Sequence, residues 1–297
     1  MGSSSNPYKR IAIIGATGQL GSDLVRILSA NEHYEVVPLD HTQIEVADEA
    51  SVRRALVRKS FDVVINTAAF HKVESCEEDP ERAFHVNALG TLHVARACAE
   101  SGAKCVYIST DYVFGGEKEE PYTEEDCPHP INVYGSSKLA GEHLVQQTAP
   151  DALILRIASV FGQAGARSKG GNFIEAILAK ARAGEALRVV NDQWMSPTYT
   201  RDVAHLLDKL LEIGASGIFH ATNQGKTTWY TFAREALKLV GLDVPVEPIS
   251  AASFPSKARR PRNSALKSVR LEQKLGRGMR PWQEALRDYL KEKGYIA

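Results

Sequence analysis

The sequence has 297 residues, enough for one large α/β domain or two smaller ones around a substantial core. It carries 36 basic and 36 acidic side chains, and this zero net charge argues against nucleic acid or an anionic membrane as the main partner. Four cysteines without C-x-x-C spacing or clustered histidines argue against a metal site or a disulfide framework, so we expect free thiols in a reducing cytoplasm. The polar amino terminus does not resemble a signal peptide, and no apolar run is long enough to span a bilayer.

The first half of the chain alternates short apolar runs with amphipathic stretches. We expect strands over residues 10–15, 34–40, 61–69, 103–110 and 151–160, and helices over residues 19–31, 48–60, 79–102 and 132–147. Alternating strands and helices indicate an α/β fold with a Rossmann-type, doubly wound parallel sheet. Strands that are apolar throughout suit a sheet with helices on both faces.

The second half is less regular. It suggests helices over residues 171–184, 200–214, 228–241 and 281–294, and short strands over residues 186–192 and 217–223. We therefore expect a Rossmann domain over residues 8–160, which can gain strands from later segments, followed by a smaller α/β domain over residues 161–297.

A glycine-rich turn, "GATGQLG", connects the first strand to the first helix. In this position, glycines let a pyrophosphate approach the backbone N–H groups at the helix start. A tight turn without a ligand is the alternative. The motif predicts that residues 8–160 bind NAD(P) through Gly15, Thr17, Gly18, Gln19, Leu20 and Gly21.

Two further strand ends point to the same coenzyme. Asp40 ends the second strand, where its carboxylate can accept hydrogen bonds from a ribose 2′-hydroxyl and would repel a 2′-phosphate. This gives NADH a slight preference over NADPH. Glu45 either reaches the adenine amino group or lies at a helix start. Ala68, Ala69 and Phe70 end the third strand, where small residues leave room for a flat coenzyme or simply pack tightly.

A possible catalytic pair follows in "NVYGSSKLAGE". Tyr134 and Lys138 are four residues apart, so they share one face of the expected helix. A nearby ammonium favours the phenolate and should lower the tyrosine pKa, which would suit proton exchange with a carbonyl oxygen. Thr110 ends the fourth strand, at the sheet edge where α/β proteins bind ligands, and its hydroxyl could share the developing negative charge.

These motifs together resemble the extended short-chain dehydrogenase/reductase superfamily, and more narrowly the dTDP-4-dehydrorhamnose reductase family. "IIGATGQLG", "NTAAF", "VNALGTLHVARAC", "STDYVF" and "VYGSSKLAGE" match that family in type and order, as do "GNF", "VVNDQWMSPTYTRDVA" and "ARRPRNSAL". The resemblance implies catalysis by Thr110, Tyr134 and Lys138, with Tyr134, Lys138 and Asn87 also at the coenzyme. It implies reduction of the 4-keto group of a dTDP-6-deoxy sugar, the last step towards dTDP-L-rhamnose.

The substrate side is assigned partly through the same resemblance. Residues 161–297 would mainly bind a nucleotide sugar, with these substrate-binding candidates: Thr110, Asp111, Tyr112, Asn172, Phe173, Trp194 and Arg260. Arginines in "ARRPRNSALKSVR" suit a diphosphate, although a solvated basic loop is the alternative. Two departures from the family pattern concern the sugar: Ser159 replaces a usual Trp, and "AAFHKVE" replaces "AAYTAVD".

Two other functions fit parts of the pattern. One is a nucleotide-sugar epimerase or dehydratase, which would recycle the hydride within one turnover. The other is a non-catalytic NAD(P)-binding subunit, such as the regulatory subunit of methionine adenosyltransferase; the intact Tyr134–Lys138 pair argues against it. Some relatives dimerise, so a homodimer is possible.

Overall fold

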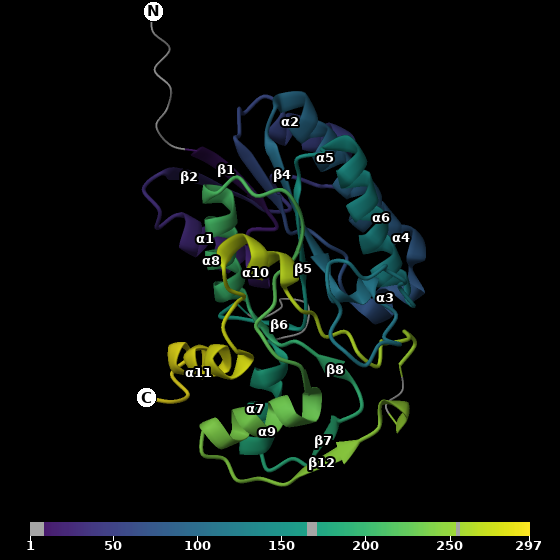
Figure 1. Ribbon diagram of the computed structural model, residues 1–297, viewed down its shortest axis with the longest axis vertical. Helices are drawn as coiled ribbons and strands as arrows, with labels where there is room; N and C mark the ends of the chain where they lie inside the picture. Colours follow the sequence, from purple (N-terminus) through teal and green to yellow (C-terminus); the bar gives the residue numbers. More distant parts are fainter. Residues whose placement is uncertain (1–8, 165–170, 254–255) are drawn as a thin grey trace, which may run out of the picture.

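The computed structural model describes residues 9–164, 171–253 and 256–297. The polar amino terminus and residue 8, where the first domain was expected to begin, lie outside these ranges. Figure 1 shows a sheet with helices on both sides, and below it a smaller group of helices and short strands. No helix in the described ranges combines the length and the apolar character that a membrane span requires.

Strands and helices alternate through the first part of the chain. Their bounds are β1 Lys9–Ile14, α1 Gln19–Leu28, β2 Tyr34–Leu39, α2 Glu49–Leu56, β3 Val63–Asn66, α3 Val73–Glu78, α4 Pro80–Phe84, η1 His85–Leu89, α5 Gly90–Ser101, β4 Lys104–Thr110, η2 Asp111–Val113, α6 Val133–Thr148 and β5 Leu153–Ile157.

Shorter strands are interspersed with helices in the remainder. Their bounds are β6 Val160–Phe161, α7 Phe173–Arg182, β7 Leu187–Val190, β8 Trp194–Met195, β9 Thr198–Tyr199, α8 Thr200–Glu212, β10 Gly217–His220, β11 Thr227–Thr228, α9 Trp229–Leu239, β12 Val246–Ile249, η3 Ala251–Ser253, α10 Val269–Leu275 and α11 Trp282–Glu292.

The main sheet has six parallel strands in the order β2-β1-β3-β4-β5-β10. This confirms the predicted α/β fold class. The sheet gains β10 from beyond residue 160, because Gly217–His220 pairs in register with Leu153–Arg156 of β5. The division at residue 160 into two domains stays a prediction.

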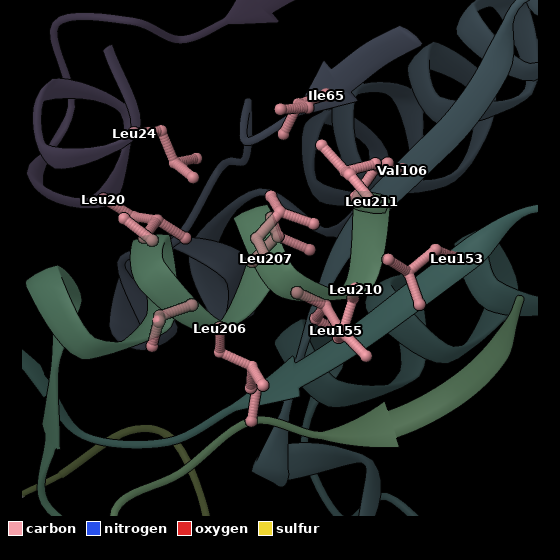
Figure 2. Close-up of a cluster of buried hydrophobic side chains, with 14 of the residues drawn as sticks. Leu20, Leu24, Ile65, Val106, Leu153, Leu155, Leu206, Leu207, Leu210 and Leu211 are labelled. Carbon is pink, nitrogen blue, oxygen red and sulfur yellow. The ribbon is translucent and has the colours of Figure 1, made fainter. Parts of the chain in front are cut away.

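Alternation along each strand explains the two covered faces. On β1, Ile11 and Ile13 belong to one buried cluster, whereas Ala12 and Ile14 belong to the other. The first cluster packs under α1 and α8, and Figure 2 shows leucines of these helices meeting strand residues such as Val106 and Leu155. The second cluster packs under α2, α5 and α6. Both faces are thus sealed, as the apolar strands required.

A third core holds the smaller lobe together. It contains apolar side chains of α7, α9 and α11, including Phe232, Trp282 and Tyr289. Two-strand ladders join β7 to β12, β8 to β11 and β6 to β9. Phe161 stacks on Tyr199 with ring centroids 5.4 Å apart, which links β6 to β9.

Two expected elements are interrupted. The helix expected over residues 79–102 consists of α4, the π-helical turn η1 and α5, and it ends at Gly102 with φ 75°. The strand expected over residues 151–160 ends at Ile157, because Ser159 adopts φ 41° and redirects the chain into β6. The spacing of apolar residues predicts neither the π-helical turn nor the early strand end, because the apolar pattern continues through both.

Removing a leucine between α8 and the sheet tests this packing. Leu207 is 0% exposed, so Leu207→Ala should lower the free energy of unfolding by about 2–5 kcal/mol through lost burial and a residual cavity. Ile213 is 45% exposed, so Ile213→Ala should change it by only about 0.5 kcal/mol. Urea unfolding followed by circular dichroism measures both, and equal losses would contradict the assigned core.

Candidate active site

A cleft of about 1470 Å³ lies at the carboxyl ends of β1 to β4 and extends to the smaller lobe. Five predicted site residues lie outside its lining: Glu45, Phe70, Asn87, Tyr112 and Trp194. The predicted residues that line it are Gly15, Thr17, Gly18, Gln19, Leu20, Gly21, Asp40, Ala68, Ala69, Thr110, Asp111, Tyr134, Lys138, Asn172, Phe173 and Arg260.

The glycine turn fits a dinucleotide. Gly15 has φ 76°, and a Cβ there would lie 2.6 Å from Oγ1 of Thr67. A Cβ on Gly21 would lie 2.1 Å from the Gly15 carbonyl oxygen, so only glycine allows α1 to begin this close to β1. The first turn of α1 carries no acidic residue. Its N–H groups can therefore face the negative charge of a pyrophosphate.

The acidic residues after β2 have different surroundings. Oδ1 of Asp40 accepts hydrogen bonds from the Thr42 amide at 2.9 Å and the Thr42 hydroxyl at 2.6 Å, which fixes the carboxylate at the cleft rim. Glu45 accepts a hydrogen bond from the Ala47 amide at 3.0 Å and is exposed outside the cleft. This arrangement supports the helix-start alternative for Glu45.

Asn87 braces the cleft from behind. Its side chain is 0% exposed, accepts a hydrogen bond from the Phe70 amide at 2.8 Å and donates to the Phe70 carbonyl at 3.0 Å. It also donates to the Ser137 hydroxyl at 2.9 Å. Asn87 therefore ties the segment after β3 to α6, and the π-helical turn places it there, as such turns often do near functional sites.

The catalytic candidates converge where β4 meets α6. Asn132 caps α6 by accepting a hydrogen bond from the Gly135 amide at 2.8 Å, which places Tyr134 in the first turn. Tyr134 and Thr110 both line the cleft at this point, and the Thr110 hydroxyl donates to Oδ1 of Asp111 at 3.0 Å. Asp111 is buried, and burial raises the pKa of its carboxyl to about 6.

The expected effect of Lys138 on the tyrosine is wrong for this state of the site. Burial raises the pKa of Tyr134 well above its ordinary value, and only the nearby Thr110 hydroxyl opposes that rise among its main causes. Loss of hydration therefore outweighs any attraction to a neighbouring cation. Tyr134 consequently holds its proton at neutral pH, which is the state that a general acid needs.

Lys138 lies beneath the site. Its Nζ donates to the Ile108 carbonyl at 2.7 Å and lies 4.1 Å from the Tyr107 ring centroid. Burial lowers the pKa of Lys138 to about 7, although the negative charge of Glu142 opposes that change. The ammonium is therefore close to its titration point near neutral pH.

Glu142 belongs to a buried ion pair that fixes α6. Nη2 of Arg156 lies 2.7 Å from Oε2 of Glu142, and Nε of Arg156 lies 2.9 Å from Oε1. The Ser109 hydroxyl also donates to Glu142. Because Ser109 precedes Thr110 on β4, these contacts fix α6 relative to the strand end that carries the threonine.

The substrate-binding candidates of the smaller lobe differ in how far contacts within the protein already engage their side chains. The Asn172 side chain caps α7 and donates to Tyr289 at 2.8 Å and to the Gly162 carbonyl at 3.3 Å, so its amide is already engaged. Phe173 packs against Trp229 in the cleft, with ring centroids 4.7 Å apart. Trp194 lies outside the cleft, and Lys226 packs over its ring.

Sequence reasoning gave less weight to several residues that line the cleft: His71, Lys180, Arg188, Gln193 and Arg259. Ser159, the departure noted above, also lines it. Arg259 belongs to the basic run and His71 to the altered segment after β3, so the sequence did contain a signal for both. Lys180 and Arg188 resemble ordinary surface cations in the sequence. Among the described residues, no group of three or more His, Cys, Asp or Glu side chains could hold a metal.

The fold and this cleft define an NAD(P)-dependent reductase of the extended short-chain dehydrogenase/reductase class. Residues 9–294 match the family model described as the RmlD substrate binding domain. The chain therefore belongs to the dTDP-4-dehydrorhamnose reductase (RmlD) family, which confirms the family indicated by the sequence motifs.

Individual relatives match over nearly the whole chain. The spore coat polysaccharide biosynthesis protein SpsK of Bacillus subtilis is 38% identical, with 96% of this chain and 98% of SpsK covered. A dTDP-4-dehydrorhamnose reductase of Mycolicibacterium smegmatis is 39% identical, with 94% and 84% covered. The crystal structure of a Bacillus anthracis dTDP-4-dehydrorhamnose reductase in complex with NADP has a TM-score of 0.92 at 34% identity, with 96% and 99% covered.

The buried ammonium of Lys138 predicts a pH-dependent stability difference. The folded protein releases this proton near pH 7, whereas the unfolded chain keeps it up to about the ordinary pKa of 10.5. The unfolded state thus binds more protons between these values, so the group becomes less destabilising as pH rises through that window. Lys138→Met should therefore be most stable relative to the original chain at or below pH 7, and this advantage should shrink towards pH 10.5.

Urea unfolding at pH 6, 7.5 and 9 measures the effect. The lost bond to Ile108 shifts all values alike, so the slope with pH is the informative quantity. Lys238→Met is the control, because Lys238 is exposed on α9 and its removal should give the same difference at each pH. A flat profile for Lys138→Met would contradict a lowered lysine pKa.

Proposed function

We propose that Thr110, Tyr134 and Lys138 carry out the NAD(P)H-dependent reduction of the 4-keto group of dTDP-4-dehydrorhamnose. The observation that supports the proposal is that Thr110, Tyr134 and Lys138 line one cleft at the strand edge, together with the glycine turn. Family membership supplies the class of substrate, a dTDP-4-keto-6-deoxy sugar.

The residues of the cleft can bind the hydride donor and can supply the proton that the reduction needs. When bound, the coenzyme supplies the hydride. Tyr134 donates its proton to the substrate oxygen as negative charge develops there, and Thr110 donates a hydrogen bond to the same oxygen. Lys138 provides positive charge beneath the site, which stabilises the phenolate that Tyr134 becomes. Gly15, Gly18 and Gly21 hold the pyrophosphate of the coenzyme.

The aromatic and basic side chains towards the smaller lobe suit the nucleotide part of the substrate. Phe173 and Trp229 offer apolar ring surface, while Lys180, Arg188 and Arg259 bring positive charge to the same cleft. A nucleoside diphosphate needs both, since its base stacks on apolar surface and its phosphates pair with cations.

Replacing the proposed acid tests the assignment. Tyr134→Phe removes the proton that the substrate oxygen must receive, so kcat should fall by roughly 10²–10⁴-fold. The assay follows coenzyme absorbance at 340 nm with dTDP-4-dehydro-L-rhamnose as substrate. Tyr34→Phe is the control and should leave kcat unchanged, because Tyr34 is at the amino end of β2 and outside the cleft lining.

Coenzyme fluorescence shows whether Tyr134→Phe still binds NADH or NADPH. A variant that binds the coenzyme and retains wild-type kcat would refute Tyr134 as the acid. Absence of turnover by the original chain with any 4-keto nucleotide sugar would refute the reductase proposal itself.

Asp40 underlies the proposed preference for NADH. Its carboxylate would repel the 2′-phosphate of NADPH, so Asp40→Asn should raise the ratio of kcat/KM for NADPH to that for NADH by about tenfold, equivalent to about 1.4 kcal/mol. Asparagine keeps an oxygen for the Thr42 hydrogen bonds. Glu45→Gln removes a nearby charge outside the cleft and should leave the ratio unchanged; equal ratios in all three proteins would contradict a role for Asp40.

A further inference from the structure

A short segment of the carboxyl-terminal part crosses to the Rossmann sheet beside the cleft. Residues 256–260, with the sequence SKARR, form this segment, here called the strap. Ser256, Ala258, Arg259 and Arg260 line the cleft, although the strap is far in sequence from the catalytic elements. Its position therefore depends on contacts that hold it to the sheet side.

One carboxylate makes most of those contacts. Oε2 of Glu74 on α3 accepts hydrogen bonds from the amides of Lys257 at 2.7 Å and Ala258 at 3.1 Å. Oε1 of Glu74 accepts one from the Ser256 hydroxyl at 2.8 Å. The guanidinium of Arg260 also pairs with Glu74 at 2.7 Å. Burial raises the pKa of Glu74, but these bonds outweigh it and lower the pKa to about 2.

The strap is also tied to the catalytic helix. The side chain of Asn132, the N-cap of α6, donates to the Arg259 carbonyl at 2.9 Å while it accepts a hydrogen bond from Gly135. Oε1 of Glu77, on the same short helix as Glu74, accepts a hydrogen bond from the Val133 amide at 2.8 Å. Helix α3, the start of α6 and the strap thus form one connected unit beside Tyr134.

The two arginines of the strap have different environments. Arg260 pairs with Glu74 and donates to the Ser256 hydroxyl, so its charge is largely matched inside the protein. Arg259 is exposed and lines the cleft, and within the described ranges its guanidinium takes part in no ion pair. Its charge remains available to an anion in the cleft.

We propose that Glu74 is a positioning residue that fixes the strap so that Arg259, rather than Arg260, meets the diphosphate of the substrate. This inference rests on the proposed function for the identity of the anion. The contacts between Glu74 and the strap, here called the latch, do not depend on it. It also gives a role to the altered segment after β3, which brought in Glu74. Glu74 acts through the strap, because it lies outside the lining of the cleft.

Limited proteolysis tests the latch without reference to activity. Trypsin cuts after Lys257 and Arg259 only when the strap leaves its hydrogen bonds, so Glu74→Gln should speed these cuts by about tenfold, the change expected for about 1.4 kcal/mol of local stability. Mass spectrometry identifies the fragments. Glu78→Gln is the matched control: Glu78 is on the same helix, and in the described part of the chain it pairs with the exposed side chain of Lys257 and not with the strap backbone. Its rate of cleavage after Arg259 should match that of the original chain.

Calorimetric titration with dTDP tests the role of Arg259 and also needs no turnover. Glu74→Gln and Arg259→Ala should each weaken dTDP binding by about tenfold, and the double variant should lose little more than Arg259→Ala, because both changes remove one interaction. NADPH affinity should stay within about twofold in all of them. In kinetics the same variants should raise KM for the sugar nucleotide and leave kcat nearly unchanged.

Each result has a defined meaning. Equal trypsin rates in Glu74→Gln and the original chain would overturn the latch. Faster cleavage with unchanged dTDP affinity would overturn the link to Arg259, and additive losses in the double variant would do the same. A chain that shows both expected effects but turns over no 4-keto sugar would keep this inference and reject the proposed reaction.

Discussion

The burial of α6 against the end of β4 is the constraint on which the whole site depends. Tyr134 can meet Thr110 only if the helix and the strand keep a fixed axial position. Three buried polar contacts maintain that position: the Glu142–Arg156 ion pair, the Lys138–Ile108 bond and the Asn87–Ser137 bond. Each would be costly to break because its groups have no access to water.

The same burial decides the protonation of the site. Tyr134 loses hydration and keeps its proton, whereas Lys138 loses hydration and becomes easier to deprotonate. The two shifts have one cause and opposite chemical results, because burial disfavours whichever form is charged. A reductase gains from this arrangement. Tyr134 is protonated before substrate binds, and the positive charge of Lys138 stabilises the phenolate that forms when Tyr134 gives up its proton.

Local pattern was enough to predict the fold class and the chemical end of the cleft. The strand–glycine–helix order located Gly15 and Gly21, and the four-residue spacing placed Tyr134 and Lys138 on one helical face. Such features depend on residues close together in the sequence. The direction of the tyrosine pKa shift was missed, because spacing reports the neighbouring charge but not the depth of burial.

The sequence pattern could not predict contacts between segments that are far apart in the chain. Nothing local to Glu74 indicates that it binds amides 183 and 184 residues away. Likewise, the asparagine in "GNF" resembles a ligand contact, but the side-chain amide of Asn172 caps α7 and hydrogen-bonds Tyr289. Side chains with several possible partners are assigned only when tertiary structure shows which partners are present.

The late origin of β10 and α8 has a consequence for synthesis on the ribosome. The leucines of α8 seal one face of the sheet, and β10 completes its edge, yet both come from residues 200–220. A nascent chain that has exposed only β1 to β5 would present bare leucine- and isoleucine-rich strands and an unpaired edge to solvent, a state prone to aggregation and to chaperone capture. Residues 217–220 must be synthesised before the coenzyme-binding sheet can close.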